Sequence, residues 1–399
     1  MLIWSNFSPV LPLLFVEWRL SGAMAGVIVA SCEAGYVISV FLTGYLADRI
    51  GGRRTFAISA IETGVFATAF ALLAHDFWSA LILRTLAGIG QGGLYVPGMR
   101  ILSNWYPPRE RGKAIGIFTC SLVGASAGAN YIAGPLAANY GWRTGVFWTS
   151  VWAFPAGALM FFLVRDTPPR MTDGGSHETF KNTVLLNKPS WLITLSYTGH
   201  MWELYAMRDW INPYINACAR TLGYSAPDAL IVGSVIAATC ILMGAFSPGI
   251  GGLLSDRIGR CKAIILIMSL SIPCSLTYGW LIGLPLPVLA VIGLFYGFWI
   301  VADTAIFKAG LSELVPERFI GSALGLQSLL GFGVTTISSA FLGVVLDWTN
   351  DPLLVRQLGY FPFWGWAFTQ LGFVSVIGPI AAFILMRNPA SAQMAGGKR

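Results

Sequence analysis

The sequence predicts an all-α membrane protein with twelve transmembrane helices in two pseudo-symmetric six-helix bundles. Three observations support this prediction: a mean hydropathy of +0.68, apolar runs of membrane-spanning length, and a motif that occurs twice. Hydrophobic residues make up 55% of the chain and charged residues only 11%, which is typical of polytopic membrane proteins. A soluble multidomain enzyme is excluded, because the apolar runs leave no segment long enough for a water-facing core.

The repeated motif ends a long apolar run in each half of the chain. Its first copy is Gly44–Arg54, and its second copy, 208 positions later, is Gly252–Lys262. A second short motif, which begins at Glu110 and again at Glu317, recurs near the same offset. The chain is therefore predicted to consist of two related halves.

A membrane-spanning helix needs about 20 apolar residues. The twelve expected spans are 1–16, 23–46, 55–74, 78–102, 114–136, 144–164, 190–215, 229–253, 263–282, 286–308, 321–346 and 361–386. The first span is short, since about 16 residues reach roughly 24 Å across a hydrocarbon core of about 30 Å. This helix either sits shallow in the membrane or begins upstream of Met1, and we expect the latter.

These spans divide the chain into four parts. We expect an N-terminal bundle over residues 1–164, a cytoplasmic linker over 165–189, a C-terminal bundle over 190–386 and a cytoplasmic tail over 387–399. Most of the 25 Lys and Arg residues fall in loops on the side of the repeated motif. By the positive-inside rule, this bias predicts a multi-pass protein of the inner (plasma) membrane with both termini in the cytoplasm.

Charge and cysteine usage exclude several other classes of protein. The net charge of +7 is spread over short loops, so it reports membrane topology rather than a nucleic-acid partner. The six cysteines have no C-x-x-C spacing, which argues against a disulfide framework or a zinc site. The three histidines are scattered, and no nucleophile stands beside a base, so we expect no enzyme, no metal and no cofactor.

Two six-helix halves, a central loop and the repeated motif together resemble the major facilitator superfamily over essentially the whole chain. The family's signature G-x-L-A-D-R-x-G-R-K is met in the first copy at Gly44, Leu46, Ala47, Asp48, Arg49 and Gly51, and in the second at Gly252, Leu254, Asp256, Arg257, Gly259 and Arg260. The copies depart from it at Gly52 and Cys261, where a basic residue is usual. The resemblance implies a secondary transporter in which this motif latches the outward-open state.

The physical chemistry of the motif agrees with a latch. Asp48 lies where a helix leaves the membrane, so its carboxylate is placed to cap a neighbouring helix and pair with nearby arginines, at about 0.5–2 kcal/mol. The alternative is that the motif only anchors the loop by the positive-inside rule. The expected latch residues are Gly44, Asp48, Arg49, Arg53, Asp256 and Arg257.

A further resemblance concerns Arg84, which is followed by Gly88 and Gly90 in a pattern similar to the family's R-x-x-Q-G-x-G, with Ala87 where Gln is usual. It implies that Arg84 takes part in proton coupling. The extended glycine-proline motif of the family's exporters is not met in the span 114–136, which disfavours drug antiport.

Inserting a charged side chain at membrane depth costs about 2.5–3.5 kcal/mol of free energy on insertion scales. Each such residue is therefore expected to have a structural or functional role. The candidates for proton coupling are Glu33, Arg84, Glu203 and Asp303. A carboxylate near an arginine can change its protonation state as its surroundings change, which is how a proton gradient would be coupled. For Asp303 the alternative is a purely structural pairing with Lys308.

The span 190–215 carries the most polar residues. Tyr205, Arg208 and Asp209 lie close together on it, and Asn212-Pro213 interrupts its outer end, as in the gating helices of transporters. We interpret this arc as one wall of a solute cavity. The alternative is a network that pins the helix to its neighbours. The full set of expected substrate-binding residues is Arg84, Tyr205, Arg208, Asp209, Asn130, Tyr131 and Gln327.

The expected function is secondary active transport of a small polar or anionic organic solute by alternating access, coupled to protons as a symporting permease. One alternative is a drug or metabolite proton antiporter. Another is a receptor or assembly factor that keeps the fold without transport. The expected partners are a small-molecule solute, protons or another coupling ion, and the lipid bilayer, with no nucleic acid. We expect a monomer.

Overall fold

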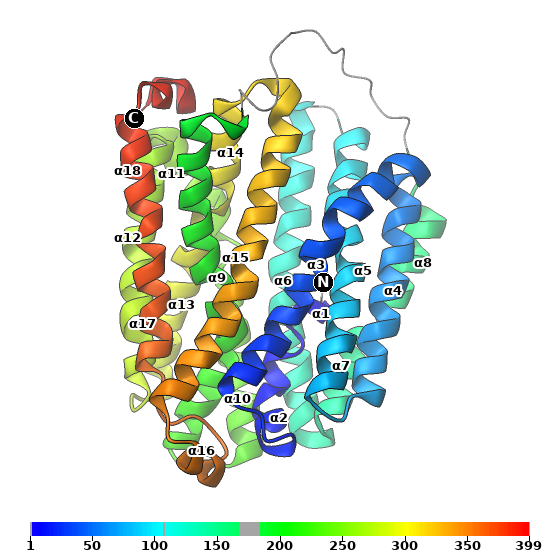
Figure 1. Ribbon diagram of the computed structural model, residues 1–399, viewed down its shortest axis with the longest axis vertical. Helices are drawn as coiled ribbons and strands as arrows, with labels where there is room; N and C mark the ends of the chain where they lie inside the picture. The colour runs from blue at the N-terminus through cyan, green and yellow to red at the C-terminus, as the bar shows by residue number, and fades with distance from the viewer. Residues whose placement is uncertain (1, 107, 167–183, 399) are drawn as a thin grey trace.

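The computed structural model describes residues 2–106, 108–166 and 184–398, without the side chains of residues 41, 48, 103, 108–113, 115, 116 and 318. The described residues form helices and no strands, which confirms the predicted fold class (Figure 1). The first half contains α1 (Leu2–Ser5), η1 (Ser8–Val10), α2 (Leu11–Glu17), α3 (Gly22–Ile50), α4 (Gly52–Leu73), α5 (Phe77–Trp105), α6 (Pro108–Tyr140), α7 (Trp142–Ser150) and α8 (Ala153–Leu163).

The second half contains more broken helices. They are α9 (Lys188–Thr221), α10 (Ala226–Met243), α11 (Ser247–Ile258), α12 (Arg260–Tyr278), η3 (Gly279–Leu281), α13 (Leu286–Ala302), α14 (Thr304–Leu314), η4 (Glu317–Phe319), α15 (Ile320–Thr349), α16 (Pro352–Leu358), α17 (Gly365–Ser375), α18 (Ile377–Arg387) and η5 (Pro389–Gly397). Three pairs in this half (α10 with α11, α13 with α14, α17 with α18) each form one span with a short break.

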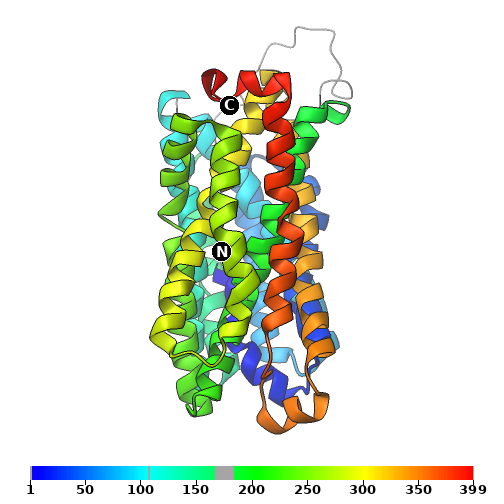
Figure 2. The same cartoon turned by 90° about the vertical axis from the view of Figure 1, so that its left-hand side faces the viewer.

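Among the described residues, eight segments are long and apolar enough to cross a membrane. They are Gly22–Val40, Gly52–Leu73, Trp142–Leu163, Ala226–Ile258, Arg260–Leu281, Leu286–Leu314, Ile320–Thr349 and Gly365–Arg387. The other predicted spans fall on the short apolar segment Leu2–Glu17 and on the long helices α5, α6 and α9. The spans run roughly side by side along the long axis of the molecule (Figure 2).

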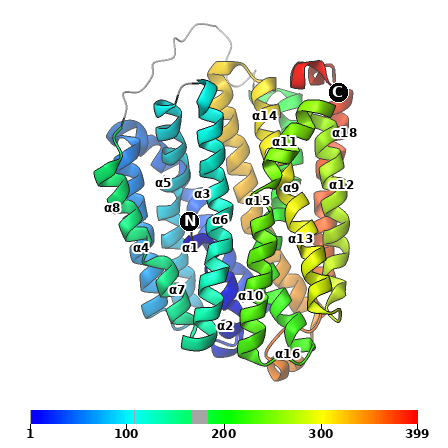
Figure 3. The ribbon, with the colours of Figure 1, turned by 180° about the vertical axis from the view of Figure 1, so that it is seen from behind.

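Helices α1–α8 pack as one bundle and α9–α18 as another, with α3 against α15 and α6 against α10 where the bundles meet (Figures 1 and 3). We call the end of the molecule at which α3 and α11 terminate the motif face. The opposite face carries α16. The contact between the two bundles differs at these two faces.

The corner after each motif copy has the same backbone. Gly51 and Gly259, which lie 208 positions apart, have φ angles of 92° and 99°. Residues with a side chain rarely adopt such angles, so glycine lets the chain turn directly from one helix into the next. The repeat seen in the sequence is therefore also a repeat of local structure.

The bundles are in close contact toward the opposite face. A methyl group added to Gly22 of α3 would collide with the carbonyl of Gly343 on α15, and one added to Gly26 would collide with Ala340. Toward the motif face the two helices diverge (Figure 1), and a methyl group on Gly44 or Gly325 would meet nothing within 4 Å. Small residues thus allow the close crossing at one end only.

A capping box at the start of α5 gives a testable contribution to stability. The Asp76 carboxylate accepts hydrogen bonds from the Ser79 hydroxyl (2.5 Å) and backbone amide (2.8 Å), and these bonds hold the pKa of Asp76 below its usual value of 3.8. A depressed folded-state pKa means that stability is fully present above the unfolded value and is lost as the pH falls through the folded value.

We therefore expect Asp76→Ala to lower the melting temperature of the detergent-solubilised protein at neutral pH. The difference from wild type should shrink as the pH falls below 3.8 and through the lower folded-state pKa, because the carboxylate is then protonated in both states. Asp76→Asn keeps an oxygen acceptor for the helix terminus and should retain most of the stability. Identical melting curves for Asp76→Ala and wild type at neutral pH would contradict the assignment.

Candidate functional site

Four charged side chains lie where the two bundles meet, and we call them the central charge cluster. Glu33 comes from α3, Arg84 from α5, and Arg208 and Asp209 from α9. Glu33, Arg84 and Asp209 are only 1%, 4% and 5% exposed, and Arg208 is partly buried. They are close enough to act on one another electrostatically. Two cations and two anions from both bundles thus share one buried region.

The polar atoms of this cluster are incompletely paired. Both carboxylate oxygens of Glu33, the Nε atom of Arg84, and the Nε and Nη2 atoms of Arg208 are buried without a hydrogen-bond partner among the described residues. None of the four side chains forms an ion pair within 4 Å with another described side chain. Since buried polar atoms are nearly always paired in proteins, this concentration of free donors and acceptors is suited to a polar ligand.

Segments from both bundles contact the two acidic residues of the cluster. Ser339 of α15 donates a hydrogen bond to Asp209 (2.7 Å), and Ser8 of η1 donates one to the Asp209 carbonyl (2.5 Å). Glu33 lies beside the hydroxyl of Thr335 on α15 without a well-formed hydrogen bond to it. Movement of one bundle relative to the other would change the surroundings of both carboxylates.

The two arginines are positioned by aromatic rings rather than by acids. The guanidinium carbon of Arg84 lies 4.6 Å from the ring centre of Phe7 and 6.0 Å from that of Phe70. That of Arg208 lies 4.0 Å from the ring centre of Tyr205. Cation–π contacts of this kind hold a cation while leaving its N–H groups available to a ligand.

Four rings from four segments pack together beside the cluster, and we call them the aromatic layer: Trp4, Tyr36, Tyr205 and Phe332. The ring centres of Tyr36 and Phe332 are 4.7 Å apart, those of Trp4 and Tyr36 5.3 Å, and those of Tyr205 and Phe332 5.4 Å. The layer therefore joins the two bundles through apolar contact directly next to their shared charges.

A hydrogen-bonded contact closes the bundles at the opposite face. The Asp347 carboxylate of α15 accepts bonds from the backbone amides of Gly22 (2.6 Å) and Ala23 (2.8 Å), at the first turn of α3. The free amides and the dipole of a helix N-terminus favour a carboxylate there. Sequence reasoning missed this latch, because an acid 325 residues from its partner leaves no local pattern.

A second polar network lies inside the C-terminal bundle. The Nδ1 atom of His200 lies 2.9 Å from the Oδ1 atom of Asp303, which sits at the break between α13 and α14. Glu203 accepts hydrogen bonds from Ser275 (2.5 Å) and Ser271 (3.2 Å) of α12. The structure thus separates Glu203 and Asp303 from Glu33, and it pairs Asp303 with His200.

Lys308 is not the partner of Asp303. Its ammonium group donates to Ser328 of α15 (2.9 Å) and lies 4.3 Å from the ring centre of Tyr197. The alternative of a structural Asp303–Lys308 pair is therefore wrong. The partner of Asp303 is His200, and no local sequence pattern signals this contact, because the two residues lie on different segments far apart in the chain.

Comparison with known proteins assigns the family. A family model described as the Major Facilitator Superfamily matches residues 1–339. The chain belongs to this superfamily. The crystal structure of a bacterial homologue of the human lysosomal transporter Spinster, in an inward-facing and occupied conformation, has the same fold, with a TM-score of 0.77 at 16% identity over 97% of this chain and 93% of that one.

Relatives in the superfamily include transporters of organic acids. The hexuronate transporter of Bacillus subtilis (strain 168) is 24% identical over 365 residues, covering 87% of this chain and 84% of that protein. A probable 4-methylmuconolactone transporter of Cupriavidus pinatubonensis (strain JMP 134 / LMG 1197) is 27% identical over 351 residues, covering 82% and 78%. The membrane sensor protein UhpC of Escherichia coli (strain K12) is 24% identical over 370 residues, covering 86% and 82%. The chain is thus a multi-pass solute transporter of the superfamily and not an enzyme.

The described members of the superfamily's loop motif contact their own bundles. The Arg53 amide donates to Asp166 (2.9 Å), and the Arg53 guanidinium lies 5.2 Å from the ring centre of Phe161. Arg49 lies over Tyr45 at 4.7 Å, and Gly44 has open space beside it. The side chain of Asp48 lies outside the described residues.

In the second motif copy, Asp256 pairs with Arg260 at 2.5 Å, while Arg257 is exposed. Arg260 also pairs with Glu313 of α14 at 2.7 Å. In this conformation, then, the contacts of the motif among the described side chains stay within one bundle. The contact of Asp347 with the first turn of α3, by contrast, joins the two bundles, and it lies at the opposite face.

The remaining predicted site residues are distributed around the interface of the bundles. Asn130 of α6 accepts a hydrogen bond from Asn212 of α9 (3.0 Å), which joins the bundles through two amides. Tyr131 is 39% exposed, and its hydroxyl contacts Thr239 of α10 at 2.5 Å. Gln327 of α15 is fully buried, and neither end of its amide has a hydrogen-bond partner within the described part of the chain.

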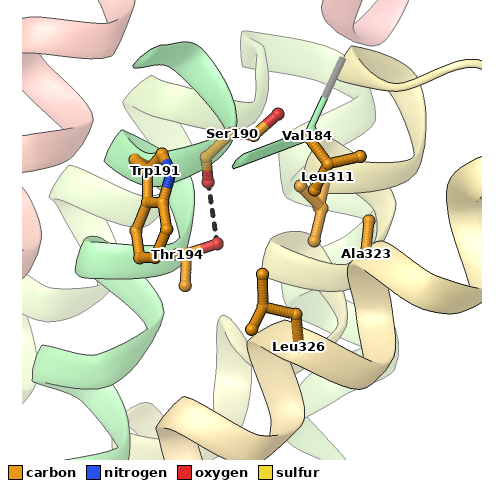
Figure 4. Close-up of a pocket in the computed structure, with 7 residues that line it drawn as sticks. All are labelled: Val184, Ser190, Trp191, Thr194, Leu311, Ala323 and Leu326. Atoms are coloured by element: carbon orange, nitrogen blue, oxygen red, sulfur yellow. Dashed lines mark hydrogen bonds between the residues drawn. The ribbon is translucent and has the colours of Figure 1, made fainter. Parts of the chain in front are cut away.

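Two small pockets accompany these groups. One lies at the motif-face end of the C-terminal bundle, where Thr194 donates to the Ser190 carbonyl (2.7 Å) (Figure 4). Its lining is mostly apolar and consists of Val184, Ser190, Trp191, Thr194, Leu311, Ala323 and Leu326. The other adjoins Arg84 and is lined by Ile3, Asn6, Ala67, Phe70, Arg84, Ala87 and Val146. Only the second adjoins the central charge cluster, so the first is not part of the candidate site.

Proposed function

We propose that this transporter is a proton-coupled symporter that takes up a small organic anion by alternating access. The observation that carries the proposal is the central charge cluster, in which arginines from both bundles keep N–H groups that no described residue pairs, beside two carboxylates. An anion held by Arg84 and Arg208 would contact both bundles at once. Hexuronate, which names the transported solute of one relative, is such an anion.

The balance of charge supports coupling to protons. Two arginines are offset by Glu33 and Asp209, so a bound anion brings an excess negative charge into a buried region. Buried charge is costly unless it is compensated. A proton on Glu33 compensates it, because the carboxylate then becomes neutral. We propose Glu33 and Arg84 as the coupling pair, with Asp209 and Tyr205 as further walls of the solute site.

The other predicted residues have secondary roles in this proposal. Glu203 and Asp303 form a second proton-accepting network inside the C-terminal bundle, with His200 as the partner of Asp303. Asn130, Tyr131 and Gln327 line the bundle contacts that change during transport.

The direction of opening follows from the expected topology. If the motif face is cytoplasmic, as the distribution of Lys and Arg predicts, the contact at Asp347 closes the outer side, and this conformation faces inward. We propose that the loop motif, including Gly44, Asp48, Arg49, Arg53, Asp256 and Arg257, closes the cytoplasmic side in the outward-facing state. Both termini then lie in the cytoplasm of a cell whose inner membrane holds the protein.

The coupling role of Glu33 is tested in proteoliposomes. We expect Glu33→Gln, which is permanently neutral, to catalyse anion counterflow but not proton-driven accumulation, and to lose the pH dependence of exchange. Glu62→Gln on α4 is the matched control, and it should behave as wild type. Proton-driven accumulation by Glu33→Gln at the wild-type level would refute the role of Glu33, and the same assay on Asp303→Asn tests the second network.

The similarity to UhpC favours one other candidate function, that of a sensor which binds a solute without moving it. Counterflow separates the two candidates. A sensor binds the anion but exchanges none across the membrane, whereas a transporter exchanges it in both directions. Outward movement of the anion driven by an inward proton gradient would indicate an antiporter.

A further inference from the structure

The aromatic layer has a regular relation to the central charge cluster. Each of its rings lies three or four residues from a polar residue of the cluster or its supports, on the same helix or segment. The pairs are Trp4 and Ser8, Tyr36 and Glu33, Tyr205 and Arg208, and Phe332 and Thr335. One helical turn rises about 5.4 Å, so the rings form a second layer one turn from the charges.

All four rings lie on the same side of the charges. The chain runs toward the motif face in α3, where Tyr36 follows Glu33, and away from it in α9, where Tyr205 precedes Arg208. The chain also runs away from the motif face in α15, where Phe332 precedes Thr335. The aromatic layer therefore stands between the charge cluster and the motif face, where the bundles diverge.

The aromatic layer also presents unused contact surface. Trp4, Tyr205 and Phe332 are each partly exposed, and the indole Nε1 of Trp4 is buried without a hydrogen-bond partner among the described residues. The guanidinium of Arg208, 4.0 Å from the ring centre of Tyr205, connects the two layers. A ligand that reaches from the arginines toward the motif face therefore meets mainly aromatic surface, with hydrogen-bonding groups only at the Trp4 indole and the Tyr36 and Tyr205 hydroxyls of the layer.

We infer that the transported solute is a planar, unsaturated monocarboxylate, with its carboxylate at Arg84 and Arg208 and its body among the rings of the aromatic layer. This inference rests on the proposed function. Rings recognise a flat π system through stacked and edge-to-face contacts. A sugar acid carries a hydroxyl group on most of its carbons, and the three hydrogen-bonding groups of the layer are too few to replace all the water that these hydroxyls would lose. When Glu33 is protonated, the two arginines and Asp209 together carry one net positive charge. A single carboxylate on the solute neutralises that charge.

Three probe anions test the inference on the full chain in proteoliposomes. Benzoate and cyclohexanecarboxylate have the same carboxylate and the same number of carbons, but only benzoate is flat and unsaturated. Glucuronate carries hydroxyl groups instead. We expect benzoate to bind about tenfold more tightly than cyclohexanecarboxylate, and glucuronate to bind more weakly than either. Each affinity is measured by inhibition of benzoate counterflow and by direct titration of the purified protein.

Variants of Trp4 assign the preference to the aromatic layer. Trp4→Leu should bring the affinities for benzoate and cyclohexanecarboxylate together, while acetate, which has no body to reach the rings, should bind as it does to wild type. Trp4→Phe keeps a ring and should keep most of the preference, and Phe332→Leu repeats the test if Trp4→Leu does not fold. Trp78→Leu is the matched control, because Trp78 is exposed on the outside of α5.

The outcomes separate the inference from the proposed function. Tight binding of glucuronate with weak binding of benzoate would overturn the inference and leave anion transport intact. A preference for benzoate that survives both Trp4→Leu and Phe332→Leu would overturn the role of the aromatic layer. Exchange of none of these anions, nor of sulfonates or acetate, would overturn the proposed function itself.

Discussion

Arg208→Gln is expected to abolish transport of the organic anion while leaving a folded protein. The substitution removes a cation from the interface of the bundles and leaves Asp209 and Glu33 with less compensation. Arg208 is proposed to pair with the bound anion, and losing one partner of a buried charge pair costs about 2–5 kcal/mol, which corresponds to a loss of affinity of at least roughly thirtyfold. Counterflow rates and the dissociation constant of the anion measure the effect directly.

Controls distinguish a binding role from a structural one. Arg208→Lys keeps the charge but loses the planar fork of N–H donors, so we expect an intermediate affinity. Arg220→Gln, on the same helix, removes a hydrogen bond to the Tyr224 carbonyl and a contact with the Tyr360 ring (5.8 Å), both away from the central charge cluster, and should transport normally. Arg84→Gln should resemble Arg208→Gln. Wild-type affinity and proton dependence in both Arg84→Gln and Arg208→Gln would remove these arginines from the site.

Asp347→Ala is expected to shift the protein away from the conformation described here. The carboxylate caps two amides of α3 from the other bundle, and loss of a helix cap costs about 0.5–2 kcal/mol. The cap stabilises only the conformation in which it forms. The ratio of the two conformations should therefore change by roughly twofold to thirtyfold.

Spin labels on the opposite face measure this shift. Tyr140 at the end of α6 and Leu353 on α16 are exposed and belong to different bundles, so cysteines at these positions report the separation of the bundles. Cys120 is also exposed and is replaced by serine in the labelled protein. We expect Asp347→Ala to increase the population with a long distance between the labels. Asp351→Ala, which removes only the cap of α16, is the control. An unchanged distance distribution in Asp347→Ala would show that the cap does not hold the bundles together.

Much of the fold follows from local properties of the chain. Hydropathy predicts the spans, and the repeated motif predicts a recurring corner, because Gly51 and Gly259 occupy backbone angles that favour glycine. Helix boundaries shift where a span is broken, as at Asp303, since a single polar residue in an apolar run has little effect on average hydropathy.

Local sequence patterns predicted less of the candidate site than of the fold. Spacing on α9 grouped Tyr205, Arg208 and Asp209, because residues three or four apart share a helix face. It gave no means of finding Ser339 or Ser8, which hold Asp209 from other segments. Trp4 and Phe332 were missed for the same reason, since an aromatic residue in a membrane span is ordinarily a lipid or core contact.

By itself, the sequence determined the class of the molecule: twelve spans in two related halves, a doubled motif, and charges at membrane depth. These features follow from composition and short-range spacing, which do not depend on how the helices pack against one another. Only the tertiary structure decided which charges meet, that Asp303 pairs with His200, and that Asp347 closes the bundles at the face opposite the motif. Those contacts join residues on different helices, and their geometry depends on how the two bundles pack, which no local pattern in the chain records.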